Sequence, residues 1–168
     1  LNKKEIFEII KDINNNNLNE AELTYFVSGC YSHGLDMTEI EYLTEAIVKA
    51  GHKLNLKRHP IVDKHSIGGI PGNRTTMIVV PIIASLGFTM PKTSSRAISS
   101  PAGTADTMES LAQVSFDVKE IEHIVHKTNG CMVWGGAVDL ASADDKMIRV
   151  RNPLRLDPNG LLLASIMA

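Results

Sequence analysis

Two polar loops, each placed between a short apolar stretch and a helical pattern, constrain the fold of this 168-residue chain most strongly. The first covers residues 64–73 (KHSIGGIPGN) after the apolar pair Ile61 and Val62, and the second covers residues 92–104 (KTSSRAISSPAGT) after residues 88–91. A repeated order of strand, loop and helix indicates a parallel α/β sheet, in which ligands bind at the carboxyl ends of the strands. We therefore expect an α/β domain whose ligand site is built from these two loops.

Both loops combine cationic side chains, hydroxyls and glycine-exposed backbone amides, which is the chemistry that phosphate binding requires. In the first loop Lys64 precedes the glycines, and His65 is a further candidate donor. This loop is not a Walker A motif, because no Gly-Lys-Ser/Thr follows, and its glycine spacing differs from the dinucleotide fingerprint. The alternative interpretation is a tight turn between a strand and a helix.

The second loop is stronger evidence for anion binding, because it places Arg96 among several hydroxyls. An arginine can hold a phosphate or a carboxylate through two parallel hydrogen bonds. The alternative interpretation is a solvated loop with helix caps. The hydroxyls belong to Thr93, Ser94, Ser95, Ser99, Ser100 and Thr104.

The N-terminal part of the chain has helical patterns. Isoleucines within residues 6–13 recur at the spacing i, i+3, i+4 and i+7, which predicts the buried stripe of a helix. Asn19 with Glu22, and Thr38 with Glu41, have the spacing of capping boxes, so we expect helices to begin there. Three short helices in a row are stable only when they pack on something else.

The α/β part contains further predicted elements. We expect helices over residues 75–85 and 104–111, the first kinked or shortened by Pro81. Asp117 caps a third helix that continues through residue 128, and residues 132–134 read as a strand. After these elements the pattern becomes helical again.

Composition limits the partners and the location. The formal net charge of −2 and the pI near 6.3 argue against a general basic surface, so we expect neither nucleic acid nor a membrane as a partner. Cys30 and Cys131 suggest neither a disulfide framework nor a metal motif. Without an apolar run of about 18 residues or a signal peptide, a cytoplasmic location is expected. The chain begins with Leu1 and ends at Ala168 inside an apolar run, so we expect it to be part of a longer protein.

Asp157 has two interpretations. An aspartate before Pro158 is usually a helix N-cap. As a catalytic acid it would have to hold a proton near neutral pH, and a bound phosphate could supply the negative charge that this needs. The residues alone favour the cap.

Three segments together carry a family resemblance: residues 64–69 (KHSIGG), 94–98 (SSRAI) and 102–109 (AGTADTME). They resemble the thymidine phosphorylase family of nucleoside phosphorylases, and most closely its archaeal-type AMP phosphorylase branch. The third segment is similar to the signature stretch of that family and is highly specific. The resemblance covers nearly the whole chain, and full-length family members are much longer.

The resemblance implies an α/β fold with a small all-helical domain, described as nucleoside phosphorylase II or phosphoribosyltransferase-like, of which this chain forms a part. The helical domain would comprise residues 1–54, rejoined by about 144–168. Residues 55–143 would form the first part of the α/β phosphate-binding domain. In this family the active site lies between the two domains.

The resemblance also implies an enzyme, a pentosyltransferase that cleaves the N-glycosidic bond of a nucleoside 5′-monophosphate. AMP and phosphate would give adenine and ribose 1,5-bisphosphate. No cofactor and no metal are expected, since phosphate is a co-substrate, and the protein is expected to be a homo-oligomer.

Site residues follow from the resemblance position by position. Asp157 matches the residue assigned as proton donor, which reverses the preference for an N-cap. The attacking phosphate would be held by Lys64, Ser66, Ser94 and Thr104. The nucleotide would contact Gly69, Ser95, Arg96, Ala97, Ile98, Ser99, Ser100, Thr104 and Ser165.

Other functions stay open at this point. A thymidine or pyrimidine-nucleoside phosphorylase is the first alternative, although Pro71 and the stretch 99–101 depart from the thymidine enzyme and Arg151 matches its pyrimidine-binding arginine only across a gap. The related anthranilate phosphoribosyltransferase fold, which needs diphosphate and magnesium, is another. A non-catalytic phosphate-binding module is the alternative from a different class.

Overall fold

The structure is a computed structural model that describes residues 1–57, 60–65, 74–97, 103–137 and 140–168. The chain divides into two compact units. The helical unit comprises Leu1–His52 and Asp139–Ala168, and the α/β unit comprises Lys53–Val138.

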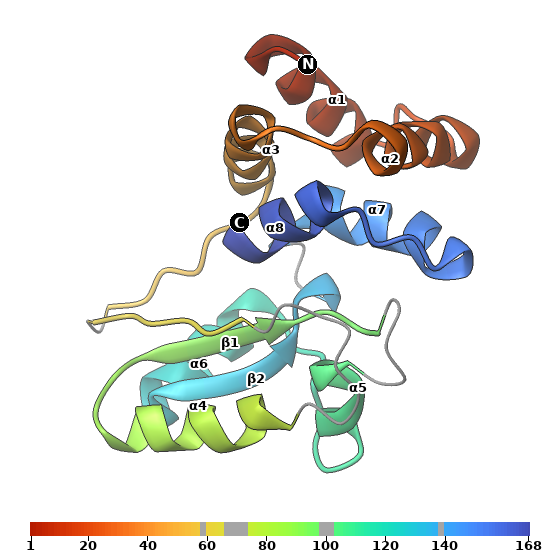
Figure 1. Ribbon diagram of the computed structural model, residues 1–168. Helices are drawn as coiled ribbons and strands as arrows, with labels where there is room; N and C mark the ends of the chain where they lie inside the picture. The colour runs from red at the N-terminus through yellow and green to blue at the C-terminus, as the bar shows by residue number, and fades with distance from the viewer. Residues whose placement is uncertain (58–59, 66–73, 98–102, 138–139) are drawn as a thin grey trace. The chain divides into compact units, whose positions relative to one another are not determined.

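The helical unit contains helices from both ends of the sequence (Figure 1). Its helices are α1 (Lys3–Asn14), α2 (Glu20–His33), α3 (Met37–Ala50), α7 (Ser142–Leu154) and α8 (Asn159–Met167). They surround one apolar core, to which α7 adds the fully buried Met147 and α8 adds Leu161. The predicted isoleucine stripe is confirmed, since Ile6, Ile10 and Ile13 are buried in this core.

Capping boxes fix where α2 and α3 begin. The Asn19 side chain accepts from the backbone N–H of Glu22 at 3.0 Å, and the Glu22 carboxylate accepts from the Asn19 N–H at 2.9 Å, as predicted. The predicted box at Thr38 is wrong, because Asp36 is the N-cap of α3 and pairs with Glu39 at 2.8 Å. An aspartate with a glutamate three residues later satisfies the same two amides.

The α/β unit is built on two parallel strands, β1 (Met90–Ser94) and β2 (Gly130–Trp134), with Met90 opposite Gly130 and Ser94 opposite Trp134. The expected strand at Ile61 is reduced to an isolated parallel bridge to Thr89. The helices α4 (Thr75–Ser85), α5 (Thr104–Glu109) and α6 (Val118–Thr128) all pack against β2 (Figure 1). A short 3₁₀ turn, η1 (Gly135–Ala137), follows β2.

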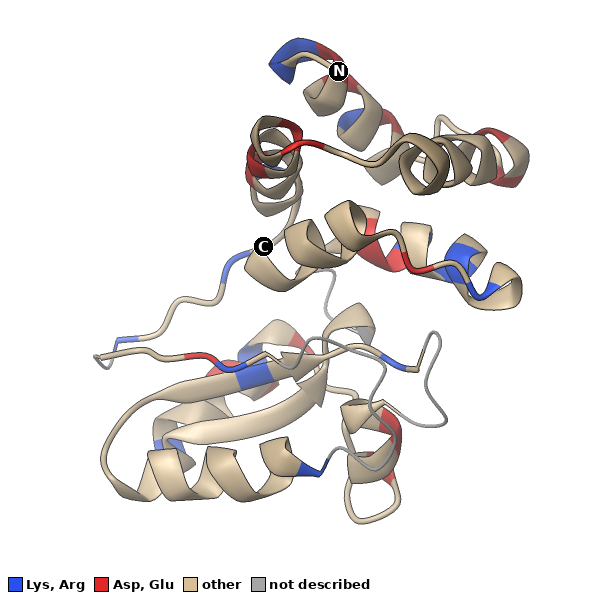
Figure 2. Ribbon diagram, in the orientation of Figure 1, with Lys and Arg blue, Asp and Glu red and all other residues tan. Residues whose placement is uncertain are grey.

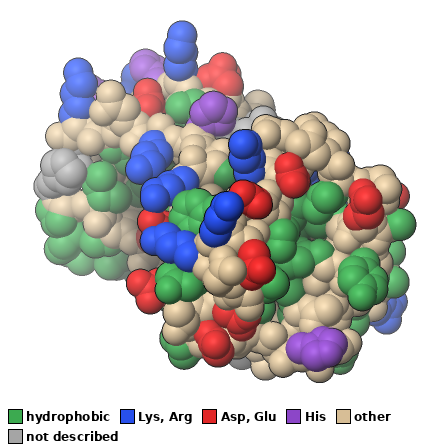
Figure 3. Space-filling view, turned by 90° about the horizontal axis from the view of Figure 1, so that it is seen from above, with side chains coloured by type: hydrophobic (Ala, Val, Ile, Leu, Met, Phe, Trp, Pro, Cys, Tyr) green, Lys and Arg blue, Asp and Glu red, His purple; other side chains and the backbone are tan. Residues whose placement is uncertain are grey.

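The formal net charge of the chain, −2, is close to zero. On the face shown in Figure 3, Lys and Arg side chains lie among Asp and Glu side chains. Within the part of the chain that the structure describes, no helix has the length and apolar character needed to cross a membrane.

Candidate functional site

The second polar loop is anchored at both ends. Ser94 is the last residue of β1, and Thr104 is the first residue of α5. The Ser94 hydroxyl donates to the carbonyl oxygen of Ser95 at 3.2 Å, and the Ser95 side chain is exposed. The predicted residues Ile98, Ser99 and Ser100 of this loop, and Ser66 and Gly69 of the first loop, lie outside the described residues.

Asp106, on the first turn of α5, holds the two ends of the second loop together. One carboxylate oxygen accepts from the backbone N–H groups of Ala97 at 2.8 Å and Gly103 at 2.9 Å. The other accepts from the Arg96 guanidinium at 3.0 Å. Burial raises the pKa of Asp106, but these donors outweigh it, and the pKa lies below its usual value.

Gly103 is required by the close approach of the two ends. A Cβ atom at this position would lie 2.8 Å from the Ala97 nitrogen and 2.9 Å from the Ser95 carbonyl oxygen. Both neighbours are backbone atoms, which cannot move away without opening the loop.

Arg96 has a different immediate environment from the one that the sequence suggests. Its guanidinium binds both carboxylate oxygens of Glu109, at 2.7 and 2.9 Å, and lies over the Trp134 ring at 4.6 Å from the centroid. In this structure the Arg96 guanidinium therefore donates hydrogen bonds to carboxylates of α5. Its contact with substrate stays a prediction.

A connected group of charged side chains lies where the first loop begins. The Lys92 ammonium, only 3% exposed, is 3.0 Å from Nε2 of His65 and 3.7 Å from a carboxylate oxygen of Asp63. His65 Nδ1 is 2.8 Å from the other Asp63 oxygen. When His65 Nδ1 donates to Asp63, its Nε2 can accept from Lys92, so the three side chains form one hydrogen-bonded network.

The charges in this group affect one another. Burial raises the pKa of Asp63. The hydrogen bond with His65 and the positive charge of Lys92 outweigh burial, so that the pKa falls to about 2. Burial lowers the pKa of Lys92, and the neighbouring charge of Lys64 adds to the effect. The predicted phosphate residue Lys64 donates to the Thr76 hydroxyl at 3.1 Å. Lys64 and Lys92 are therefore close enough for their charges to interact.

Sequence reasoning missed Lys92 and Asp106 as site components. The sequence reading assigned Lys92 to the loop, whereas the structure places it inside β1, two residues after the buried Met90 and therefore on the same buried face of the strand. The signal for Asp106 was its spacing of three residues from Gly103, which is the spacing of a capping residue.

In the helical unit, the two predicted site residues both have charged partners. Asp157 forms an ion pair with the fully buried Arg151. The Ser165 hydroxyl, on α8, donates to a carboxylate oxygen of Asp144. The N-cap interpretation of Asp157 is wrong, because Pro158 occupies the N-cap of α8 and no side chain caps it.

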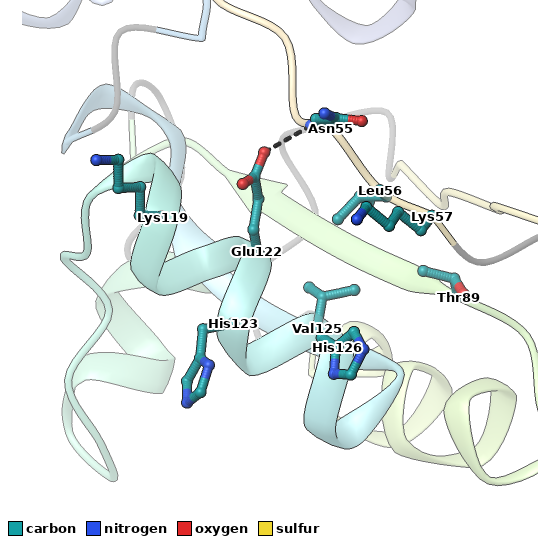
Figure 4. Close-up of a pocket in the computed structure, with 9 residues that line it drawn as sticks. All are labelled: Asn55, Leu56, Lys57, Thr89, Lys119, Glu122, His123, Val125 and His126. Atoms are coloured by element: carbon teal, nitrogen blue, oxygen red, sulfur yellow. Dashed lines mark hydrogen bonds between the residues drawn. The ribbon is translucent and has the colours of Figure 1, made fainter.

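A hollow of about 340 Å³ lies elsewhere in the α/β unit, between α6, residues 55–57 and Thr89 (Figure 4). The Asn55 N–H donates to Glu122 of α6 at 2.7 Å across it, the bond dashed in Figure 4. None of the predicted site residues that the structure describes lines this hollow. Thr89, which directly precedes β1, is one of its lining residues, whereas Ser94 at the carboxyl end of that strand is not.

Comparison with known proteins relates the chain to a family and to a fold. Residues 58–157 match the family model described as glycosyl transferase family, a/b domain. The crystal structure of anthranilate phosphoribosyltransferase (TrpD) from Thermus thermophilus is similar with a TM-score of 0.76 at 20% identity, over 99% of this chain and 51% of that chain. The phosphoribosyltransferase-like α/β fold expected from the sequence is thereby confirmed.

Curated relatives are similar along the whole chain. The AMP phosphorylase of Thermofilum pendens is 56% identical over 158 residues, which are 94% of this chain and 31% of the relative. The AMP phosphorylase of Pyrococcus furiosus is 55% identical over 168 residues, and that of Methanocaldococcus jannaschii is 52% identical over the same length. The chain covers 33% of each of these two relatives.

Proposed function

The chain belongs to the glycosyl transferase family whose α/β domain it matches, and on this premise we propose that the protein is a phosphorylase of nucleoside 5′-monophosphates. With AMP, an oxygen of inorganic phosphate forms a bond to C1′ of the ribose while the bond from C1′ to adenine breaks. The products are adenine and ribose 1,5-bisphosphate. The observation that carries the proposal is the similarity of 94–100% of the chain to AMP phosphorylases, at 52–56% identity for the relatives compared.

The proposed binding of phosphate uses the edge of the strands where β1 ends. Lys64 supplies a positive charge, and Ser94 and Thr104 supply hydroxyl donors, together with Ser66. The reaction passes through a sugar with cationic character, so a phosphate held at C1′ both attacks and stabilises the developing charge. Lys92 is buried with its charge in the same region and adds to the positive potential that holds the anion.

The second loop has more donors than one phosphate needs. We assign residues 95–100, with Thr104, to the nucleotide, and Ser165 to a further contact. Asp106 and Gly103 serve this role indirectly, since they fix the two ends of the loop.

Asp157 is proposed as the general acid. Adenine is a poor leaving group unless a ring nitrogen takes up a proton as the glycosidic bond breaks. The proton would come from the Asp157 carboxyl group, which returns to the carboxylate. In the helical unit its carboxylate is bound by the buried Arg151 guanidinium.

Replacement of Asp157 tests this role in the naturally occurring protein. Asp157→Asn is expected to lower kcat for AMP by about a hundredfold or more, since a positioned general acid contributes roughly that factor. Glu8→Gln is the matched control, because it also turns a carboxylate into an amide but lies exposed on α1. Turnover of Asp157→Asn close to that of the control would exclude Asp157 as the acid.

A comparison of substrates tests the proposed function as a whole. AMP is expected to be cleaved faster than adenosine, uridine or thymidine when phosphate is present. Preference for thymidine or uridine would assign the protein to the pyrimidine-nucleoside phosphorylases. Activity only with diphosphate and magnesium would assign it to the phosphoribosyltransferases that share its fold. We further propose that the protein is a cytoplasmic homo-oligomer that requires neither a metal nor a cofactor.

A further inference from the structure

One helix holds both predicted site residues of the helical unit. Ser165 and Asp157 each bind a charged side chain of α7, namely Asp144 and Arg151. The acidic residues of this helix lie in its first turn, and a basic residue lies in its last turn (Figure 2). Asp144 and Arg151 are seven positions apart in the sequence, which is close to two helical turns, so both lie on the same face of α7.

Arg151 is buried completely, with 0% of its side chain exposed. One guanidinium nitrogen, Nη2, donates to Asp157, and Nε donates to the carbonyl oxygen of Leu156 at 3.4 Å. Among the described residues its third nitrogen, Nη1, has no partner. A buried guanidinium is stable only when it is paired, so Asp157 is the residue that compensates its charge.

Asp144 is also buried, with 7% of the residue exposed. It accepts the Ser165 hydroxyl through Oδ2, whereas Oδ1 has no partner within the described part of the chain. Burial raises its pKa, although the hydrogen bond of Ser165 and the charge of Arg151 act in the opposite direction. The two buried groups of α7 are therefore also coupled to each other.

We infer that Asp144 and Arg151 are positioning residues, which fix the orientation of Ser165 and Asp157 for the reaction without touching the substrate. The inference rests on the proposed function of Asp157. Each of the two buried charges of α7 binds one of the two residues of the helical unit that we propose to act on the nucleotide.

A double-mutant cycle in the naturally occurring protein tests the inference. Arg151→Met is expected to lower kcat for AMP by about tenfold to a hundredfold, because a misplaced catalytic group costs that much. The KM for phosphate should stay within about twofold, since Arg151 holds no phosphate in this account. In the Asp157→Asn background the same replacement should cause no further loss, because its target is already absent.

Further variants keep the test decisive if Arg151→Met does not fold. Arg151→Lys retains the charge and should retain more kcat than the Met variant, and added guanidinium should restore part of the activity of Arg151→Ala. Asp144→Ala should raise the KM for AMP by the same factor as Ser165→Ala, with no additional increase when both are replaced. Circular dichroism and the melting temperature report whether each variant is folded.

The outcomes distinguish failure of the positioning role of Arg151 from failure of the proposed role of Asp157. If Asp157→Asn is impaired but Arg151→Met lowers kcat by the same factor with and without Asp157, the positioning role is overturned and the proposed function stands. If Asp157→Asn has normal turnover, the proposed acid role fails first and the inference falls with it. If Arg151→Met lowers kcat only when Asp157 is present, and the KM for phosphate is unchanged, the inference is supported.

Discussion

Removal of the Asp106 carboxylate is the perturbation that most directly tests how the second loop is held. Asp106→Ala deletes three hydrogen bonds, to the N–H groups of Ala97 and Gly103 and to Arg96. The side chain is 29% exposed, so water replaces part of what is lost. Hydrogen bonds to a charged acceptor stabilise by more than neutral ones, and we expect a local cost of roughly 2–4 kcal/mol.

The assay is hydrogen–deuterium exchange of the peptides that contain residues 97 and 103, in the naturally occurring protein. A cost of about 2 kcal/mol corresponds to about thirtyfold faster exchange of these two amides. Asp106→Asn keeps one carbonyl oxygen and should lose only part of the protection. The KM for phosphate should rise in parallel, because Thr104 follows Gly103 directly.

Glu109→Gln is the matched control for this experiment. Glu109 also binds Arg96, but it accepts neither loop amide among the described bonds. Its replacement should leave exchange at residues 97 and 103 unchanged. Exchange in Asp106→Ala within about threefold of the unmodified protein would refute the role of Asp106 as the clamp of this loop.

Three further predictions follow from single sites. Gly103→Ala should destabilise the protein by about 1–3 kcal/mol, because its Cβ would lie 2.8 Å from a backbone nitrogen. Gly29→Ala, at an open position inside α2, should instead stabilise by about 0.5–1 kcal/mol, and urea unfolding compares the two. Because the pKa of Asp63 falls from 3.8 to about 2 on folding, the stability that it contributes is present above about pH 4 and is lost as the pH falls toward 2. In Asp63→Asn the free energy of unfolding should decrease less over this acidic pH range. An unchanged decrease would exclude the interactions of Asp63 as its source. Burial raises the pKa of Cys30 to about 11 and that of Cys131 to about 12, so neither thiol should react with iodoacetamide near pH ~8 until urea unfolds the protein. Labelling of either cysteine in the folded protein would contradict this.

Elements that depend on nearby residues could be predicted from the sequence. The helices that begin after Asn19 and Asp117 start as expected, because their caps are satisfied within the first turn. The start of α3 was misplaced because Asp36 with Glu39 offers the same spacing as the expected pair. Local chemistry limits a helix start to a few residues but does not choose between adjacent candidates.

Features that depend on distant residues could not be predicted. The strand expected at Ile61 shrinks to one bridge, because its pairing depends on Thr89 rather than on its own apolar residues. Lys92 is buried because Asp63 and His65 reach it from a segment that lies far away in the sequence. A pattern that treats lysine as a surface residue has no means of finding such a group.

The site residues show the same division. The polar loops and their glycines were recognisable, because tight approaches such as the one at Gly103 require particular residue types. The partner of Asp157 could not be recognised from the sequence, because an aspartate before a proline can either cap a helix or form an ion pair. The buried guanidinium of Arg151 decides between them, because a charged donor binds a carboxylate more strongly than a backbone amide does.

Product analysis with and without phosphate tests the central claim most directly. The naturally occurring protein is incubated with AMP, adenine is quantified by chromatography, and the sugar phosphate is identified by phosphorus NMR. The proposed reaction predicts adenine and ribose 1,5-bisphosphate in equal amounts, and only when phosphate is added. Adenine released without phosphate, together with ribose 5-phosphate, or no cleavage of AMP under either condition, would contradict it.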